Sequence, residues 1–391
     1  MKFAKVCVIV LDSVGIGELP DASRFGDAGA NTLGHIAEQV PGFSLPNLQI
    51  LGLGNIAPLR GVAAVERPLS YYGKMAETSV GKDTMTGHWE LMGLRVDTEY
   101  KTYPAGFPEE LIAQFESRTG RKVIGNTPAS GTEILEQLGE EQRKTGAWIV
   151  YTSSDSVFQI AAHEEVIPLE ELYRACRIAR ELTLQDEFGV GRVIARPYVG
   201  APGRYERTAN RHDYAVKPPA PTILNRLATS GFDVVAIGKI NDIFSGEGIT
   251  RSFATASNQV GMLKTQQLLR TNLNGLVFTN LVDFDSKFGH RRDPAGYADA
   301  LMQFDSWIPN LLRELSYDDL LIITADHGND PTYPGTDHTR EYVPILAYSP
   351  KFRNSRSLGI RNSFSDLAAT LAEIFGVEGT GQGTSFLSIL G

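Results

Sequence analysis

Unbroken runs of apolar residues recur along the chain, and each of them ends at polar residues. The clearest are residues 6–11, 234–237, 276–282 and 320–324, which are rich in Val, Ile and Leu. Such runs lack the alternation of a half-exposed strand and are typical of strands covered on both faces. We therefore predict four buried strands, followed in turn by Asp12, by Gly238 and Lys239, by Asp283 and Asp285, and by Asp326 and His327.

Helical periodicity separates these runs. One helix is indicated by apolar residues at the spacing that makes one helix face apolar, namely Tyr297, Leu301, Phe304, Ile308 and Leu311. A second is indicated at residues 169–182, where Leu172, Cys176 and Ala179 share a face. Strands that alternate with helices predict an α/β fold with a mostly parallel sheet between helices. Ligands bind at the carboxyl ends of the strands in such sheets, where the polar residues named above stand.

The middle of the chain differs in composition from its two ends. Turn-forming residues gather at 102–108, and residues 196–221 contain five prolines and several arginines. A compact α/β pattern lies between these two zones. We therefore predict an inserted α/β cap domain at 99–221, which splits a core domain into 1–98 and 222–391.

Composition and charge narrow the classes of function. The 391 residues are 42% hydrophobic and 21% charged, which is ordinary for a soluble globular protein. The net charge of −9 argues against nucleic acid as a partner, and no apolar stretch approaches the roughly eighteen residues of a membrane span. Residues 1–11 lack the long apolar core of a signal peptide, and Cys7 and Cys176 lie in patterns typical of buried thiols. We expect a cytoplasmic protein without a nucleic-acid or membrane partner, and no protein partner is implied.

Aspartates and histidines gather where the predicted strands end. Three of the seven histidines fall between residues 290 and 338, each near an aspartate. Imidazole and carboxylate are the donors expected for borderline divalent ions such as Mn²⁺ or Zn²⁺. The candidate metal ligands are Asp12, Asp285, His290, Asp326, His327 and His338.

Charge arithmetic favours two metal ions over one. Two divalent cations and three aspartates leave a charge of about +1, which suits an anionic phosphoryl group, and such a pair can clamp both oxygens of an in-line displacement. A single Asp–His pair is more typical of a turn or a helix cap, but six such residues at strand ends are hard to explain structurally. The nearby Asp283, Asp330 and Asp337 are interpreted as turn residues or as partners of the ligands.

Residues 81–90 offer a nucleophile. We predict a helix that starts at Thr84 and runs through Trp89 to Leu94, so that the hydroxyl of Thr84 stands at a helix N-terminus. Free backbone N–H groups there would favour a phosphorylated side chain, and a metal or base would activate the hydroxyl. An N-cap role is the alternative for Thr84. On composition alone, Thr86 and Asp83 compete for the same roles, and His88 is interpreted as structural.

Three motifs resemble those of the bacterial phosphopentomutases, a family within the alkaline phosphatase superfamily. They are the opening Asp-Ser-Val-Gly-Ile-Gly-Glu from Asp12, the Gly-Lys-Asp-Thr-Met-Thr-Gly-His-Trp-Glu stretch around Thr84, and Asp-His-Gly-Asn-Asp-Pro with Gly-Thr-Asp-His-Thr-Arg-Glu near the end. The similarity runs from the first strand to the C-terminus and includes the middle domain.

The resemblance implies an alkaline phosphatase-like core with a cap domain and two Mn²⁺ ions, although other divalent ions are possible. It implies that Thr84 is the phosphorylated residue. The resemblance assigns the ligands of one metal as Asp12, Asp326 and His327, and those of the other as Asp285, His290 and His338.

The implied reaction interconverts ribose 5-phosphate and ribose 1-phosphate, and the 2-deoxyribose pair, through a phosphothreonine enzyme and a 1,5-bisphosphate. A sugar bisphosphate such as glucose 1,6-bisphosphate can act as the activator in this family. A phosphoenzyme must exclude water to avoid hydrolysis, which gives the cap a purpose.

The phosphate that is not transferred needs partners away from the metals. Arginine can bind phosphate bidentately, and the candidate substrate-binding residues are Ser153, Asp155, Arg192, Arg196 and Lys239. Ordinary surface charges or turns are the alternative for each of them. We interpret the remaining arginines of this zone as surface or junction charges; they are Arg204, Arg207 and Arg211.

Two kinds of rival function stay open. One is another metal-dependent enzyme of the same superfamily, either a phosphomonoesterase or a metal-dependent phosphoglycerate mutase, because the core chemistry is shared. The other is a catalytically inactive protein that binds sugar phosphates. The cap sequence favours the pentomutase over the first rival, and the intact ligand set with Thr84 argues against the second.

Overall fold

The computed structural model describes residues 3–391 apart from 99, 154–155 and 185–186. The chain divides into two compact units. We call Met1–Thr98 with Pro218–Gly391 the core unit and Glu99–Lys217 the cap unit. The insert predicted at 99–221 covers nearly the same residues as the cap unit.

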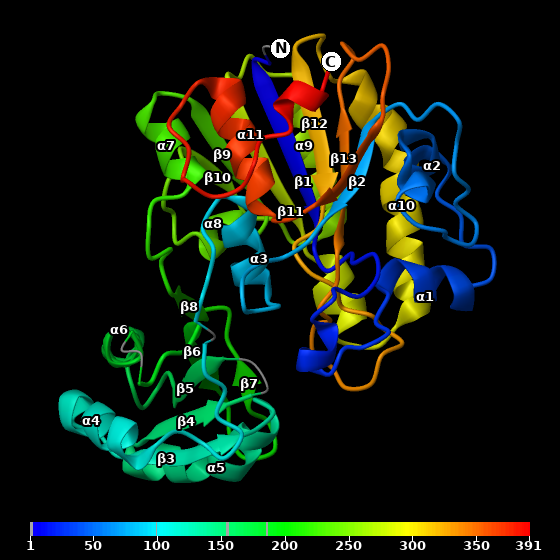
Figure 1. Ribbon diagram of the computed structural model, residues 1–391. Coiled ribbons are helices and arrows are strands. Elements are labelled where there is room, and N and C mark those ends of the chain that lie inside the picture. Colours follow the sequence, from blue (N-terminus) through cyan, green and yellow to red (C-terminus); the bar gives the residue numbers. More distant parts are fainter. Residues whose placement is uncertain (1–2, 99, 154–155, 185–186) are drawn as a thin grey trace. The chain divides into compact units, whose positions relative to one another are not determined.

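The core unit is built on one twisted sheet, which has eight strands among the described residues (Figure 1). Neighbouring strands run parallel from β10 to β12, whereas β13 is antiparallel to both of its neighbours. Strand order across the sheet is β10 (Arg251–Phe253), β9 (Asp233–Ile237), β11 (Gly275–Leu281), β1 (Lys5–Leu11), β12 (Asp319–Thr324), β13 (Val343–Tyr348), β2 (Tyr71–Met75) and β14 (Ser357–Arg361).

Strand β1 lies in the middle of this sheet. All seven of its residues are buried, because it pairs with β11 on one side and with β12 on the other and is covered on both faces. An unbroken apolar run is what such a position requires. The four strands predicted from apolar runs are confirmed as β1, β9, β11 and β12.

Helices pack in two groups beside the sheet. Helix α10 (Pro294–Arg313) contacts α1 (Thr32–Gln39), α2 (Pro46–Leu51) and α9 (Asn258–Leu269). The second group joins α11 (Ser365–Phe375) to α7 (Ile223–Thr229) and α3 (Thr84–Leu91), and α3 to α8 (Ile240–Ile243). Short turns of helix complete the unit; they are η1 (Ala22–Phe25), η2 (Leu53–Asn55), the π-helical η3 (Phe284–Gly289) and η4 (Leu387–Ile389).

Helix α10 follows directly from its sequence. Asp293 caps its N-terminus by accepting a hydrogen bond from the backbone N–H of Gly296, and Pro294 occupies the first turn. The five apolar residues predicted to share a face, Tyr297, Leu301, Phe304, Ile308 and Leu311, are all buried. The predicted helix is therefore confirmed.

The cap unit has its own sheet and its own apolar core. Its strands are β3 (Val123–Pro128), β4 (Trp148–Thr152), β5 (Val157–His163), β6 (Arg192–Val199), β7 (Glu206–Arg207) and β8 (His212–Ala215). Its helices are α4 (Glu109–Thr119), α5 (Glu133–Thr145) and α6 (Leu169–Leu182), and α6 confirms the predicted helix. Phe115, Trp148 and Phe158 are fully buried within the larger of two apolar clusters.

Both cysteines are buried, Cys7 in β1 and Cys176 in α6, and burial raises the pKa of each thiol. Their interpretation as buried thiols is confirmed. Among the described residues, we find no helix with the length and apolar character needed to cross a bilayer.

Candidate metal centre and nucleophile

Three adjacent parallel strands deliver carboxylates to one edge of the core sheet. Asp12 directly follows β1, and Asp326 lies two positions beyond the end of β12. Asp285 lies in the π-helical turn η3, just after β11. Because parallel strands end at the same edge, residues that are far apart in the chain meet there.

The first group of candidate ligands is fully buried. Asp12, Asp326 and His327 each offer one ligand atom, and these atoms all lie within 4.8 Å of one another. His327 Nε2 is 3.5 Å from Asp12 Oδ1 and 3.3 Å from Asp326 Oδ2.

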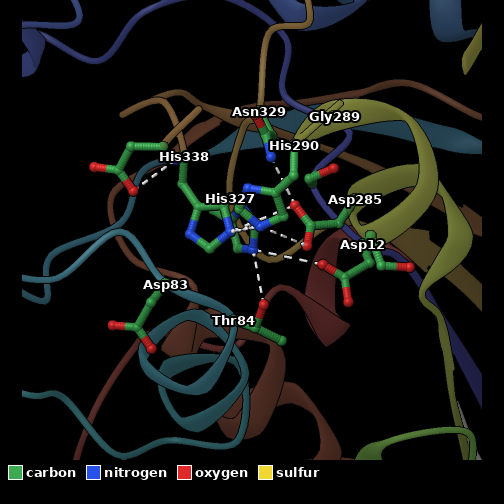
Figure 2. Close-up of polar contacts among 12 residues, drawn as sticks. Asp12, Asp83, Thr84, Asp285, Gly289, His290, His327, Asn329 and His338 are labelled. Atoms are coloured by element: carbon green, nitrogen blue, oxygen red, sulfur yellow. Dashed lines mark hydrogen bonds and ion pairs between the residues drawn. The ribbon is translucent and has the colours of Figure 1, made fainter. Parts of the chain in front are cut away.

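The second group shares His327 with the first. Asp285, His327 and His338 offer ligand atoms within 4.8 Å of one another. His290 joins them, because its Nε2 lies 3.2 Å from Asp285 Oδ2 and 3.2 Å from His338 Nε2. The structure therefore brings all six predicted ligand residues together, and Figure 2 shows the imidazoles of His290, His327 and His338 converging on the carboxylate of Asp285.

Two buried carboxylate oxygens indicate that this donor set fits a cation. Asp12 Oδ1 and Asp326 Oδ2 are inaccessible and have no hydrogen-bond partner of good geometry. A buried acceptor without a partner is costly, and metal coordination would satisfy both. Three carboxylates and three imidazoles also match the ligand preference of borderline divalent ions.

Electrostatics keeps the carboxylates of Asp285 and Asp326 ionised. Burial by itself raises the pKa of Asp285, but the charge of His338 and hydrogen bonds from His290 and His338 bring that pKa well below its usual range. Burial also acts to raise the pKa of Asp326, and nearby His327 and His88 lower it overall. Burial lowers the pKa of His327, yet the negative charges of Asp326 and Asp12 raise it well above its ordinary value. The site therefore attracts positive charge.

The hydroxyl of Thr84 faces this site. Thr84 is the first residue of α3, and its Oγ1 lies 3.1 Å from His327 Nε2 (Figure 2). Thr86, the competing hydroxyl, is buried and donates to Asp83 Oδ2 at 2.6 Å. Of the two threonines, Thr84 is therefore the one that can meet a phosphoryl group beside the ligand set.

Two backbone N–H groups at the start of α3 are not free to bind a phosphate, contrary to what the sequence prediction had assumed. Asp83 is the N-cap of α3, and its Oδ1 accepts from the backbone N–H groups of Met85 and Thr86. Those donors were expected to receive a phosphate, but they already bind a carboxylate. The helix is also shorter than predicted, ending at Leu91 rather than Leu94, because Gly93 adopts a left-handed conformation with φ +84°.

His88 connects Thr84 to the candidate ligands, a contact that sequence reasoning missed. Its Nδ1 lies 2.8 Å from the carbonyl oxygen of Thr84 and 3.0 Å from Asp326 Oδ2. Its Nε2 lies 3.3 Å from the amide nitrogen of Asn280, which also donates to Asp12 Oδ2 at 3.0 Å.

Hydrogen-bond logic fixes the tautomer of His88. A carboxylate only accepts, so the side-chain nitrogen of Asn280 must be the atom that faces Asp12. This nitrogen is a donor, so His88 Nε2 must accept and Nδ1 must carry the proton. The N–H of His88 is thereby aimed at the Thr84 carbonyl and the Asp326 carboxylate.

The predicted substrate-binding residues are divided between the two units. Ser153 follows β4 and is half-buried, and Asp155 lies outside the described residues. Arg192 and Arg196 lie on β6 of the cap unit. Lys239 lies in the core unit, exposed, as the residue before α8.

Arginines cluster within the cap unit. Arg196 Nε donates to Gln159 Oε1 at 3.1 Å, and burial together with the charges of Arg211 and Arg207 lowers the pKa of Arg196. Arg207 Nη2 donates to the hydroxyl of Tyr151 at 3.4 Å. The sequence prediction of Arg207 and Arg211 as surface or junction charges did not include this proximity to Arg196, which follows from the pairing of β6 with β7 and β8.

A model of the metalloenzyme superfamily matches residues 4–379 of the chain. The chain belongs to the metalloenzyme superfamily. Membership implies that the protein depends on a divalent metal, in agreement with the buried donor set.

One solved structure with the same fold is the phosphoglycerate mutase of Leishmania mexicana, determined at low cobalt concentration. It is 12% identical in sequence; the match covers 98% of this chain and 97% of that chain, with a TM-score of 0.53. Another is the PH0037 protein from Pyrococcus horikoshii, at 14% identity, with coverage of 96% and 98% and a TM-score of 0.50. At such identities the likeness concerns the fold alone. The predicted fold class, an alkaline phosphatase-like α/β core, is confirmed.

Proposed function

We propose that this protein is a phosphomutase that interconverts ribose 5-phosphate and ribose 1-phosphate, and the 2-deoxyribose pair, through phosphorylated Thr84. The observation that carries the proposal is the hydroxyl of Thr84, 3.1 Å from His327 Nε2 at the edge of a buried set of three carboxylates and three imidazoles. The sugar specificity is supported by the three sequence motifs that resemble those of the phosphopentomutases.

The reaction balances in two transfers. Phospho-Thr84 gives its phosphoryl group to O1 of ribose 5-phosphate, which forms ribose 1,5-bisphosphate and returns a proton to Thr84 Oγ1. Thr84 Oγ1 then attacks the 5-phosphate, which releases ribose 1-phosphate and restores the phosphothreonine. A sugar bisphosphate such as glucose 1,6-bisphosphate would supply the first phosphoryl group to an unphosphorylated chain.

The residues of the chain divide the work. Asp12, Asp326 and His327 would hold one divalent ion, and Asp285, His290 and His338 a second, with His327 near both. When bound, two ions such as Mn²⁺ supply positive charge that favours the threonine alkoxide and the transferring phosphoryl group. His88 holds the first turn of α3 against Asp326, so that Thr84 keeps its orientation.

We further propose that residues of the cap unit and Lys239 bind the substrate phosphate and sugar. The residues are those expected from the sequence, Ser153, Asp155, Arg192, Arg196 and Lys239, and Arg207 joins them because it lies near Arg196 within the cap unit. Arg196→Lys and Arg207→Lys should raise KM for ribose 5-phosphate about tenfold or more, since lysine cannot replace a bidentate arginine. Unchanged KM values in both variants would show that Arg196 and Arg207 do not bind the substrate.

A product assay tests the proposed activity. The protein with Mn²⁺ and catalytic glucose 1,6-bisphosphate should convert ribose 5-phosphate to ribose 1-phosphate without releasing free phosphate. Phosphate release without isomerisation would identify a phosphomonoesterase. Activity on phosphoglycerates alone would favour the second candidate, a phosphoglycerate mutase. We consider this candidate because the chain shares its fold with the Leishmania mexicana enzyme.

Substitution of Thr84 tests the nucleophile. Thr84→Ala should lower turnover by at least about 10³-fold, because it removes the only atom that carries the phosphoryl group. Thr84→Ser keeps a hydroxyl and should retain measurable turnover. Elemental analysis should find the same metal content in both variants as in the unaltered protein. Substantial turnover by Thr84→Ala would show that another group is phosphorylated.

A further inference from the structure

Arg292 follows the turn that carries His290 and has an unusual backbone. It adopts a left-handed conformation with φ +53°, which is uncommon for residues other than glycine. Its backbone N–H donates to the carbonyl of Gly289, so the chain turns back on itself there. The turn directs the guanidinium toward two other loops of the site.

The guanidinium donates hydrogen bonds to oxygen acceptors in these loops. Arg292 Nη1 lies 2.6 Å from Asn329 Oδ1, 2.9 Å from the carbonyl of Asp330 and 3.1 Å from that of Gly289. Its Nε donates to the carbonyl of Gly335, and its Nη2 donates to that of Asp337 at 3.0 Å. Only arginine offers this many donors in a fixed planar arrangement.

Three of these five acceptors lead directly to a candidate ligand. Gly289 precedes His290 in the chain, and Asp337 precedes His338. Asn329 links Arg292 to the candidate ligand Asp285, because its Oδ1 accepts from Arg292 and its Nδ2 donates to Asp285 Oδ1 at 2.8 Å.

Arg292 and the loop it holds also orient His290. The imidazole Nδ1 of His290 lies 2.7 Å from the carbonyl of Thr336, in the loop segment between the carbonyls of Gly335 and Asp337 that Arg292 binds. A ligand histidine that donates one ring nitrogen to a carbonyl presents the other to the metal. Nε2 of His290 accordingly faces Asp285 and His338.

The hydrogen bonds of Arg292, rather than its charge, join the loops, although the carboxylates of Asp330, Asp337 and Asp285 also act on the guanidinium. Its hydrogen-bond partners are neutral carbonyl and amide oxygens. A fixed positive charge near a cation site opposes cation binding. What the residue supplies is a set of donors that joins three loops.

We infer that Arg292 is the positioning residue of the ligand group Asp285, His290 and His338, and that it sets the affinity of one of the two metal sites. The inference rests on the proposed two-metal centre. It predicts a selective defect, in which Arg292→Lys weakens one site and leaves the group of Asp12, Asp326 and His327 intact.

The test is Mn²⁺ binding to the chelator-stripped full-length chain, measured by equilibrium dialysis together with electron paramagnetic resonance. The unaltered protein should bind two ions, with a signature of coupled spins. Arg292→Lys should bind one ion with unchanged affinity and the second about 10–100-fold more weakly, the usual effect of losing a supporting partner. Turnover should recover at high Mn²⁺. Asn329→Ala should shift the same site in the same direction.

A matched control is Arg361→Lys. Arg361 is also a partly buried arginine, which donates to Asp366 Oδ2 at 2.7 Å and to the carbonyl of Thr384. Its substitution should lower the unfolding temperature of the metal-free chain without changing either metal affinity.

Three outcomes would overturn the inference. Two ions bound with unchanged affinity by Arg292→Lys would refute Arg292 alone, and the proposed function would stand. Equal weakening of both sites with a lower unfolding temperature of the metal-free chain would indicate a general role in folding. Fewer than two ions in the unaltered protein would refute the two-metal centre itself, and the inference with it.

Discussion

Asp83 and a phosphate on the adjacent Thr84 would compete for the same positive charge at the start of α3. The carboxylate of Asp83 binds the first free N–H groups of α3. A phosphate on Thr84 would add a charge of about −1.5 to −2 beside that carboxylate. A phosphorylated Thr84 would therefore depend on positive charge from outside the helix, such as cations held by the candidate ligands.

The tautomer of His88 leads to a prediction with a built-in control. The amide nitrogen of asparagine can replace the Nδ1–H donor of histidine, whereas the amide of glutamine extends toward the position of Nε2. If the Nδ1–H bond to the Thr84 carbonyl orients the Thr84 hydroxyl, His88→Asn should keep most of kcat. His88→Gln should lose about 10–100-fold, as is usual when a partner of a metal ligand is removed.

The measurement for both variants is kcat and KM for ribose 5-phosphate, beside the unfolding temperature. We expect little change in KM, because neither variant alters a predicted substrate-binding residue. Equal losses of kcat in the two variants, in proportion to lost stability, would mean that His88 only fills space.

At the level of elements, long patterns were predictable and local turn chemistry was not. The apolar run of β1 and the periodic face of α10 each depend on many residues, so one ambiguous position does not change the prediction. The start of α3 depends on one side chain. Asp83, Thr84 and Thr86 are all good N-caps by type, and only the coordinates show that Asp83 caps the helix and leaves Thr84 free to face the site.

Glu341 joins α1 to two loop segments of the core unit, and its pKa is raised. It is fully buried, and it accepts from the backbone N–H groups of Gly17 and Thr32 and from the hydroxyls of Thr32 and Thr339. Burial raises the pKa of Glu341 to about 7, although the hydrogen bonds from the two threonines oppose the shift.

The raised pKa predicts how stability depends on pH. The folded chain holds this proton more tightly than the unfolded chain, so the contribution of Glu341 to stability is fully present below about pH 4.5 and is lost as the pH rises through about 7. The loss is on the order of 3 kcal/mol, at about 1.36 kcal/mol per pKa unit.

Glu341→Gln is the matched variant, because an amide can face the two hydroxyls with its nitrogen and the two backbone N–H groups with its oxygen. Urea unfolding at several pH values should show that the difference in free energy of unfolding between the unaltered protein and the variant shrinks between pH 4.5 and 7. Parallel profiles over that interval would show that the carboxyl group does not titrate there.

For the whole molecule, the ligand set could be predicted but its support could not. Aspartates and histidines at strand ends are recognisable by type and position. The pairs His88 with Asn280 and Arg292 with Asn329 are separated by 192 and 37 residues and consist of ordinary residue types. No periodicity marks them, because only the closed sheet and the returning loop bring them together.

The separate core of the cap unit predicts that it folds alone. A fragment of residues 99–217 should unfold cooperatively in urea, with a free energy within the usual range of about 5–15 kcal/mol. Trp148 is its only tryptophan and is fully buried, so its fluorescence reports the transition. Phe158→Ala should lower that free energy by about 3–5 kcal/mol. A fragment without a cooperative transition would show that the cap unit depends on the rest of the chain.

The central place of β1 in the sheet has a consequence for folding during synthesis on the ribosome. Its first partner, β11, starts about 270 residues later, so at ribosomal rates of roughly 5–20 residues per second this strand waits on the order of tens of seconds for a neighbour. During that interval the apolar run 6–11 of β1, with unpaired edges, is open to aggregation. The nascent chain is therefore expected to need chaperone protection at its beginning, and the metal centre can assemble only after His338 has emerged.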